Sequence, residues 1–402
     1  MSGAETAVSA SSSWMLDFVT KWIMRFGSFS VGIVALLGGL LYVKQESLLY
    51  LPSVQGIPRH NRDNPKGFQS PKDRGLEHWF NVRIPTVDNA HIHAWYLIHP
   101  GALEKDKKVP TLIFFHGNAG NIGLRLPNAC QMMQQLSCNI LLVEYRGYGD
   151  SDDHLPPSEI GLKRDAQAAY EWIVNAGAGG DTGVATVTPS SQELADNTVS
   201  YFIDSSQLYL FGRSLGGAVA FSLASYIETQ SHCLPRLAGL VVENTFTGIS
   251  AMADKLLPFL KPIKSYVLRM DWNNQQAATT LVQTPILYLA GALDDLVPHQ
   301  QMKDLYQTSM LAGNPRVTMH IVPNGTHNET WYQGGTEYWK AIRAFLSQTK
   351  KLPMNATPKS SININMEGQE TSAIPTMSSK IMDMAKEALS SSNASAGKDK
   401  KS

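Results

Sequence analysis

Short apolar runs alternate with longer segments of helical periodicity along the middle of the chain. Residues 77–84 and 91–98 alternate apolar and polar positions on either side of a polar turn, which predicts a β-hairpin. Runs that predict buried strands follow at residues 111–115, 140–143, 208–211, 239–242, 286–290 and 317–322. Helical segments, of which 159–174 is one, lie between most of them. This order predicts an α/β fold with a mostly parallel central sheet and helices on both faces.

A longer apolar stretch near the N-terminus predicts a membrane anchor. Residues 26–43 carry no charged side chain, and Lys21 and Arg25 precede them in the segment 1–25. The stretch is close to the minimum length for one transmembrane helix. No clean small-residue cleavage site follows it, which argues against the alternative of a cleaved signal peptide; a buried core helix is the other alternative. The cations favour a cytosolic N-terminus, and we expect a single-pass type II protein of the endoplasmic reticulum or another endomembrane.

Composition divides the remainder of the chain. Residues 44–75 are polar and rich in turn formers, which predicts a linker between the anchor and a domain over 76–350. Within that domain, residues 175–205 lack an apolar period and predict a flexible surface insertion. Residues 351–402 are rich in Ser, Asn and Lys and predict a disordered tail.

Charge and cysteine content exclude several function classes. Thirty-four Lys and Arg residues balance thirty-four Asp and Glu residues, so we expect no nucleic-acid partner. The three cysteines form no disulfide framework and no paired metal-binding motif. Phosphate-binding glycine motifs and the HExxH motif are absent from the sequence. We therefore expect no metal and no cofactor, and the sequence leaves the oligomeric state open.

The most informative motif is Gly212-Arg213-Ser214-Leu215-Gly216, which has the form G-x-S-x-G. It follows the strand expected at 208–211 and precedes a helical segment at 218–226. Strand, sharp turn and helix are the setting in which this motif exposes a serine nucleophile. Glycine is needed beside the serine because larger side chains would collide in the turn. The motif therefore predicts that Ser214 is a nucleophile.

Downstream residues supply the partners that a serine nucleophile needs. His327 follows the last expected strand and is the predicted base. Asp294 follows the strand at 286–290 and is the predicted acid that orients the histidine, which gives the chain order Ser, Asp, His. Asp295 is adjacent and leaves the assignment of the acid ambiguous, whereas Glu243 is a weaker substitute. The backbone N–H groups of Asn118 and Leu215 are the predicted oxyanion hole, and His116 is predicted to organise the first of these loops.

Five stretches carry a resemblance to a known family, the G-x-S-x-G motif being the least specific of them. The other four are 116–123 (HGNAGNIG), 145–149 (YRGYG), 242–246 (VENTF) and 325–328 (GTHN). With these, residues 47–347 and the N-terminal stretch resemble the α/β-hydrolases, and more narrowly the Bem-type membrane-anchored hydrolases. The resemblance implies an α/β-hydrolase fold with a small cap, preceded by one transmembrane helix, and the same Ser214, Asp294 and His327. The insertion, the doubled aspartate and the long tail depart from the pattern.

These residues together predict a membrane-anchored serine hydrolase that cleaves an ester or thioester through an acyl-enzyme. The anchor and the apolar residues of 251–267, where a cap is expected, favour a lipid or acylated substrate, with the bilayer as partner. A serine peptidase, a small polar esterase and a catalytically silent membrane scaffold are the alternatives. Four Asn-x-Ser/Thr sequons, at Asn324, Asn328, Asn355 and Asn393, leave the side of the membrane to be tested.

Overall fold

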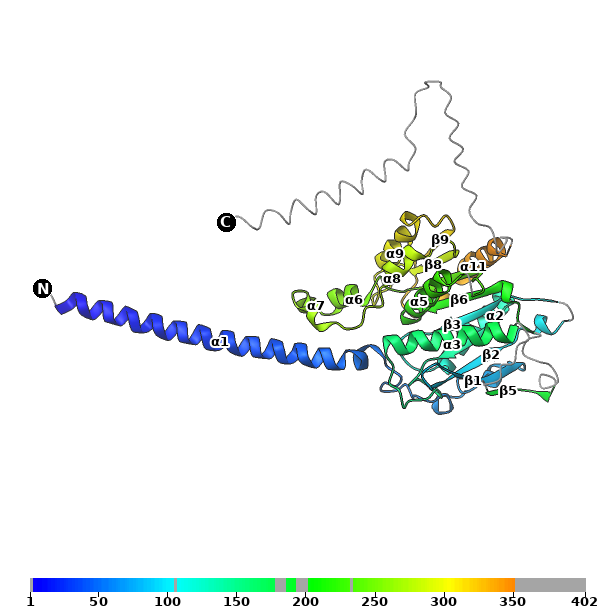
Figure 1. Ribbon diagram of the computed structural model, residues 1–402, viewed down its shortest axis with the longest axis horizontal. Coiled ribbons are helices and arrows are strands. Elements are labelled where there is room, and N and C mark those ends of the chain that lie inside the picture. The colour runs from blue at the N-terminus through cyan, green and yellow to red at the C-terminus, as the bar shows by residue number, and fades with distance from the viewer. Residues whose placement is uncertain (1–2, 105–106, 178–185, 193–201, 232–233, 351–402) are drawn as a thin grey trace, which may run out of the picture. The chain divides into compact units, whose positions relative to one another are not determined.

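The computed structural model describes residues 3–104, 107–177, 186–192, 202–231 and 234–350 (Figure 1). The tail that the sequence predicts at 351–402 lies outside the described residues, as do parts of the insertion at 175–205. A nine-stranded sheet forms the centre of the described chain, in the order β5-β1-β2-β4-β3-β6-β7-β8-β9. The strands are β1 (Trp79–Pro85), β2 (His91–Leu97), β3 (Thr111–Phe115), β4 (Asn139–Glu144), β5 (Thr186–Pro189), β6 (Leu208–Arg213), β7 (Gly239–Glu243), β8 (Ile286–Gly291) and β9 (Val317–Val322).

The sheet is parallel from β4 to β9 and antiparallel at its other end. The pairs β4–β3, β3–β6, β6–β7, β7–β8 and β8–β9 are parallel, whereas β5–β1, β1–β2 and β2–β4 are antiparallel. The predicted hairpin is confirmed as β1 and β2, and the predicted mostly parallel sheet is confirmed by the rest. Parallel pairing matters for the site because it brings the carboxyl ends of β3, β6, β7, β8 and β9 to one edge of the sheet.

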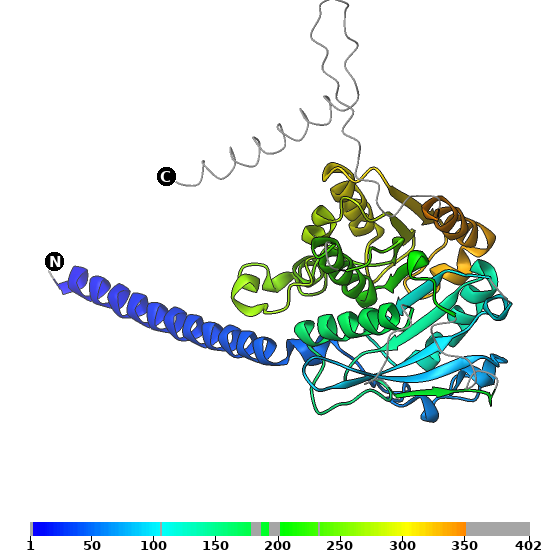
Figure 2. The ribbon, with the colours of Figure 1, turned by 45° about the vertical axis from the view of Figure 1, so that its right-hand side comes forward.

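Helices cover both faces of this sheet, as expected (Figures 1 and 2). Alternate strand residues supply two separate cores: Ile113 and Phe115 of β3 face one, and Leu112 and Phe114 face the other. The first core is covered by α3 (Glu159–Gly177), α5 (Leu215–Thr229), α8 (Asn274–Thr280) and α9 (His299–Leu311). The second is covered by α2 (Leu126–Leu136) and α11 (Gly335–Thr349). Burial on both faces explains why the strands are almost continuously apolar.

Short helices complete the fold. The segment between β7 and α8 contains α6 (Ile249–Leu256), η7 (Pro258–Leu260) and α7 (Lys264–Val267), at the place where the sequence predicts a cap. The other short helices are η1 (Asn61–Asp63), η2 (Pro71–Arg74), η3 (Pro100–Leu103), η4 (Ile122–Arg125), η6 (Ser205–Gln207) and α10 (Thr330–Gln333).

The expected insertion at 175–205 contributes a strand to the sheet. Its residues 186–189 form β5, which pairs antiparallel with β1, for example Val187 opposite Val82. The pairing covers the edge of β1, whose backbone groups would otherwise face solvent. The β-branched sequence Thr-Val-Thr suits a strand, although four residues are too few to give a clear alternating pattern.

The N-terminal helix α1 (Gly3–Leu49) continues without interruption past the apolar stretch at 26–43. Over the described residues, none of the helices combines the length and the apolar character needed to cross a bilayer. The segment that the sequence predicts as a linker, 44–75, contributes the last turn of α1 and two 3-10 helices. Asn61 and Asn64 within it are almost completely buried, so this segment packs onto the domain.

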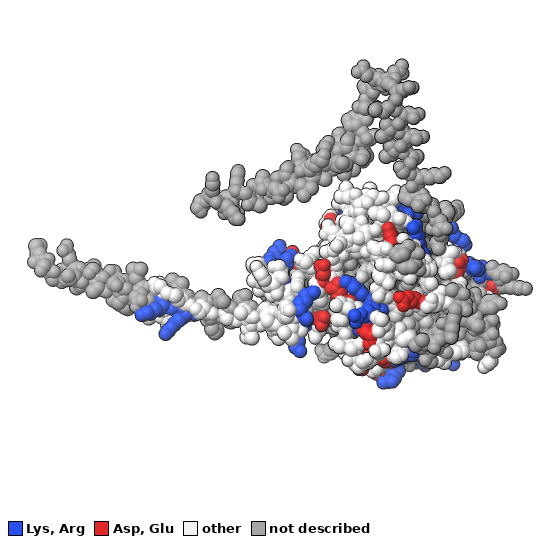
Figure 3. Space-filling model, viewed as in Figure 1, with Lys and Arg blue, Asp and Glu red and all other residues white. Residues whose placement is uncertain are grey.

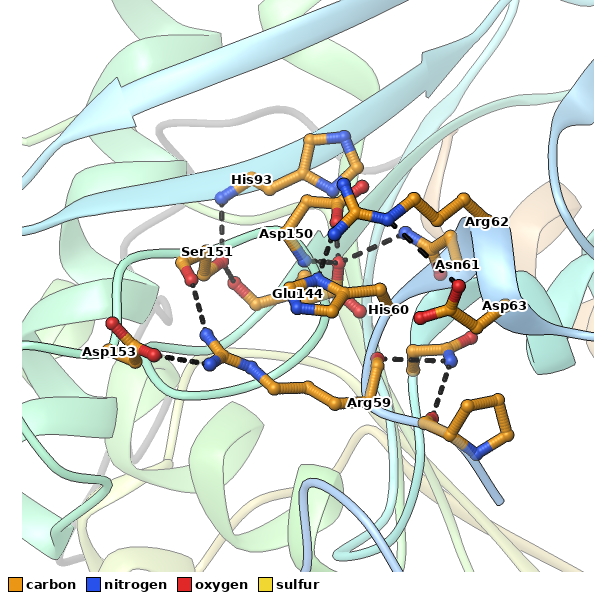
Figure 4. A network of polar contacts seen from close by, with 12 residues as sticks. Arg59, His60, Asn61, Arg62, Asp63, His93, Glu144, Asp150, Ser151 and Asp153 are labelled. Carbon is orange, nitrogen blue, oxygen red and sulfur yellow. Dashed lines mark hydrogen bonds and ion pairs between the residues drawn. The ribbon is translucent and has the colours of Figure 1, made fainter. Parts of the chain in front are cut away.

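A buried carboxylate joins that segment to the sheet (Figure 4). Glu144, at the end of β4, is fully buried and accepts hydrogen bonds from the backbone N–H groups of Ile122 (3.0 Å) and Asp150 (3.1 Å). Its carboxylate also lies 3.0 Å from His93 Nδ1 and 3.3 Å from Asn61 Nδ2. These bonds satisfy a buried charge and hold four chain segments together.

Candidate active site

Ser214 lies in a sharp turn between β6 and α5. Its backbone has φ 54° and ψ −120°, a conformation that residues other than glycine rarely adopt. A Cβ on Gly212 would lie 2.2 Å from the Gly216 carbonyl oxygen, and one on Gly216 would lie 2.0 Å from the Phe115 carbonyl oxygen. Only glycine therefore fits on either side of the serine, which is the reason for the G-x-S-x-G spacing.

The structure brings the three predicted side chains into one line of contacts. Ser214 Oγ lies 3.0 Å from His327 Nε2, and His327 Nδ1 lies 2.8 Å from Asp294 Oδ2. All three residues are at least nine-tenths buried. With Nδ1–H donating to the carboxylate, Nε2 is left as the acceptor for the serine hydroxyl. This arrangement can take a proton from Ser214 and stabilise the resulting imidazolium.

The two neighbouring aspartates differ in their surroundings. Asp294 Oδ1 accepts hydrogen bonds from the backbone N–H groups of Leu296 (3.0 Å) and Val297 (2.7 Å), which leaves Oδ2 facing His327. Asp295 is exposed. Glu243, the weaker candidate for the acid, instead pairs with Arg213 and accepts from Tyr338 Oη in the core.

Asn244 holds the histidine loop in place, a role that the sequence pattern did not predict. It follows β7 with φ 48°, and its side-chain nitrogen donates to the carbonyls of Thr326 (3.2 Å) and His327 (2.9 Å). Its side-chain oxygen accepts from Gly291 N at 2.8 Å, at the end of β8. One asparagine thus joins the β8 loop to the β9 loop. Its position inside the VENTF stretch, directly after a buried strand, is the only sequence signal for it.

The loop after β3 lies against the nucleophile. A Cβ on Gly117 would lie 3.6 Å from Ser214 Cβ, so the loop passes directly beside the serine. No hydrogen bond from the backbone N–H of Asn118 or of Leu215 is found among the described residues. The Leu215 N–H lies in the first turn of α5, where helix N–H groups lack internal partners. Free amides beside a serine can bind the negative oxygen of a tetrahedral intermediate.

Two tyrosines of the YRGYG stretch support this loop. Tyr145 Oη donates to the His116 carbonyl oxygen at 2.8 Å, and Tyr148 Oη donates to the Asn118 carbonyl oxygen at 2.8 Å. His116 is fully buried between the two rings, and burial lowers its pKa to about 3. A neutral, enclosed imidazole suits the structural role predicted for His116. The sequence pattern predicted no role for either tyrosine, because their partners lie in a separate loop.

Metal-ligating side chains do not gather in the described part of the chain. Within residues 3–350, apart from the gaps given above, no group of three or more His, Cys, Asp or Glu side chains is arranged to hold a metal ion. Basic and acidic side chains are interspersed on the face of the molecule shown in Figure 3.

Comparison with solved structures supports the fold. An alpha-beta hydrolase from Vibrio vulnificus superposes with a TM-score of 0.53 at 20% identity, covering 78% of this chain and 93% of that one. The Pyrococcus furiosus esterase PF2001 gives a TM-score of 0.51 at 18% identity, covering 75% of this chain and 98% of that one.

Sequence comparison identifies the family. No family model matches the chain. Among curated proteins, the alpha/beta hydrolase domain-containing protein WAV2 of Arabidopsis thaliana is 32% identical over 83% of this chain and 96% of its own length. Protein bem46 of Schizosaccharomyces pombe is 31% identical over 80% and 91%. An uncharacterized membrane protein of Saccharomyces cerevisiae, YNL320W, is 29% identical over 79% and 95%. This chain therefore belongs to the alpha/beta-hydrolase family, together with WAV2 and Bem46.

Proposed function

We propose that this alpha/beta-hydrolase is a serine hydrolase that cleaves a carboxylic ester or thioester through an acyl-enzyme. The observation that carries the proposal is the line of contacts from Asp294 through His327 to Ser214, with distances of 2.8 and 3.0 Å. A serine hydroxyl needs such a base to become nucleophilic, and the base needs a carboxylate to orient it.

In the proposed reaction, Ser214 Oγ forms a bond to the substrate carbonyl carbon while its proton passes to His327 Nε2. The carbonyl oxygen becomes negative and is held by the N–H groups of Asn118 and Leu215. Collapse of this intermediate breaks the bond to the alcohol or thiol, which leaves with the proton from His327. Water then attacks the acyl-enzyme with His327 as base, releasing the acid and restoring Ser214.

The first prediction concerns the nucleophile. Ser214→Ala should abolish covalent labelling by a fluorophosphonate probe, because the reacting oxygen is removed while a buried methyl group remains. Ser222→Ala, half-buried in helix α5 directly after the turn, is the matched control and should label like the wild-type chain. Labelling that persists at full strength in Ser214→Ala would falsify the proposal.

The second prediction separates the two aspartates. Asp294→Asn should lower kcat by about 10³- to 10⁴-fold, because an amide at this position no longer favours the productive histidine tautomer or stabilises the imidazolium. Asp295→Asn makes the same carboxylate-to-amide change on an exposed side chain, and it should leave kcat near that of the wild-type chain. Steady-state hydrolysis of a chromogenic ester measures both, and equal losses in the two variants would refute the assignment.

We propose a lipid or acylated substrate on the basis of the apolar side chains around the loop that carries Asp294, which we call the acid loop. Leu293 and Leu296 flank Asp294 and are exposed, Leu293 by 59%. Leu256 and Phe259, in and beside the cap helix α6, are also exposed. Lys255 of α6 donates hydrogen bonds to the carbonyl of Leu296, at 2.8 Å, and to that of Asp295, so this part of the cap lies against the acid loop. Exposed apolar side chains gathered beside a site favour an apolar acyl group.

The third prediction follows from this apolar surface. With nitrophenyl esters of acetate, octanoate and palmitate, kcat/KM should rise from the shortest acyl chain to a longer one. Each additional buried methylene contributes up to about 0.8 kcal/mol to binding. The matched thioester series, run on the same protein, tells whether the enzyme prefers sulfur or oxygen leaving groups. A maximum at acetate, or efficient cleavage of peptide amides instead, would favour the small-esterase or peptidase alternative.

We also propose that residues 26–43 anchor the chain in a membrane as a single-pass type II protein of an endomembrane. The support is the absence of charged residues over that stretch and the cations before it. The relative YNL320W, which is described as a membrane protein, supports the same proposal.

The fourth prediction tests this anchor. The wild-type chain should stay in the membrane pellet after extraction with alkaline carbonate. Leu36→Arg combined with Leu40→Arg should release it, because each charge in the bilayer centre costs about 2.5–3.5 kcal/mol. Leu36→Ala combined with Leu40→Ala is the matched control and should remain in the pellet. Extraction of the wild-type chain into the supernatant would contradict the anchor, and a mass decrease on glycosidase treatment would support a lumenal catalytic domain.

A further inference from the structure

The end of helix α1 is hydrogen-bonded to the loop that carries Asn118. Leu51 N donates to the Asn118 carbonyl oxygen at 2.9 Å, and the Asn118 side-chain nitrogen donates to the Leu49 carbonyl oxygen at 3.2 Å. Gly120 N donates to the Leu51 carbonyl oxygen at 3.1 Å, so Leu51 pairs with Ala119 as a short parallel bridge. Asn118 is thereby held at its carbonyl and at its side chain, while its own N–H has no partner within the described chain.

Tyr148 reinforces this junction. Its hydroxyl donates to the Asn118 carbonyl oxygen at 2.8 Å and accepts from Leu51 N at 3.0 Å. The tyrosine side chain is almost completely buried. A buried hydroxyl that bonds both partners of one contact restricts how far they can separate, because a broken bond would leave a polar group unsatisfied.

The same end of α1 is fixed to the segment that follows the cap. Gln45 is 5% exposed, and its side-chain oxygen accepts from Arg269 N (2.8 Å) and Met270 N (3.3 Å). Its side-chain nitrogen donates to the Val267 carbonyl at 3.2 Å. Trp272 Nε1 donates to Tyr50 Oη at 2.9 Å, which adds a second buried contact.

One helical turn connects these two sets of bonds. Tyr50 N donates to the Glu46 carbonyl oxygen at 2.8 Å, so Gln45 and the residues up to Leu51 form a continuous, hydrogen-bonded unit. Nearer the N-terminus of α1, a Cβ on Gly38 would lie 3.6 Å from Val267, so the helix also packs against α7. We call residues 45–51 the strap. The strap contacts both residues 267–270, which we call the cap side, and the loop beside Ser214.

We propose that the strap is a positioning element for the oxyanion hole, and that docking of Gln45 on residues 267–270 fixes the Asn118 N–H in its catalytic place. This inference rests on the proposed serine-hydrolase function. An oxyanion donor acts mainly in the transition state, so its misplacement lowers kcat with little change in KM. The strap makes the orientation of α1 relative to the cap a determinant of turnover.

The test uses the full-length chain and two strap variants. Gln45→Ala removes the bonds to the cap side without touching the loop, and Tyr148→Phe removes only the bridging hydroxyl. Each should lower kcat by about tenfold or more, since a small misplacement of a catalytic group is costly, while KM stays near the wild-type value.

Asn314→Ala is the matched control. Asn314 is a buried amide, 2% exposed, whose nitrogen donates to the carbonyls of Leu281 and Thr284 at 2.7 and 2.8 Å. It precedes β9, at the edge of the sheet opposite the site. Its substitution should cost comparable stability but leave kcat close to wild type, which separates positioning from general destabilisation.

Hydrogen exchange provides a readout that does not depend on activity. Peptides covering residues 116–123 should exchange faster in Gln45→Ala than in the wild-type chain, and should be unchanged in Asn314→Ala. Unchanged exchange of that loop in Gln45→Ala overturns the strap, as does a wild-type kcat in both strap variants. If the wild-type chain shows no probe labelling at Ser214, the proposed function alone is overturned. The hydrogen-exchange rate of residues 116–123 then still tests whether the strap positions that loop.

Discussion

The turn at Ser214 is packed so tightly that it determines where the neighbouring chain segments lie. Gly216 approaches the Phe115 carbonyl so closely that an added Cβ would lie 2.0 Å away, and one on Gly217 would lie 2.5 Å from Thr245 Cβ. The turn is therefore in contact with the loop after β3 on one side and the segment after β7 on the other. Thr245 Oγ1 donates to the Ser214 carbonyl oxygen at 2.7 Å and holds the second contact. A serine kept at a rarely populated backbone geometry needs such support on both sides.

The parallel sheet places Asp294 and His327 next to this turn. Because β7, β8 and β9 run parallel, the loops that bear Asn244, Asp294 and His327 leave the sheet at the same edge as Ser214. Asn244 then bonds both the β8 and β9 loops, so the histidine is positioned by the Asn244 amide, which donates to the His327 carbonyl, as well as by Asp294. A site built on strand ends is held more precisely than one built on loops alone, since strand pairing fixes the point at which each loop begins.

The sequence predicted the parts of this fold that depend on local pattern. Apolar runs gave the strands, and the chain order of motif, acid and base named Ser214, Asp294 and His327, which the structure brings together; their catalytic roles remain predictions. Contacts between polar residues far apart in the sequence could not be predicted from the local pattern. Asn61, Asn64 and Glu144 are buried because each meets partners far away in the chain. A polar, proline-containing segment such as 44–75 has the same composition whether it is a linker or packs onto a domain. The four-residue strand β5 failed to show a period for the simpler reason that it is short.

The same limitation explains why the role of residues 49–64 emerges only from the structure. At one end of the loop 116–123, Leu49 and Leu51 bond Asn118 and Gly120; at the other, Asn61 Oδ1 accepts from Gly123 N at 3.0 Å. The loop beside the nucleophile is thus held at both ends by chain that precedes the sheet. A preorganised oxyanion hole requires donors that do not reorganise during the reaction, and such double support supplies that rigidity. The N-terminal region therefore supports the loop that carries the proposed oxyanion donor, and a domain boundary drawn after residue 75 would separate the loop from its support.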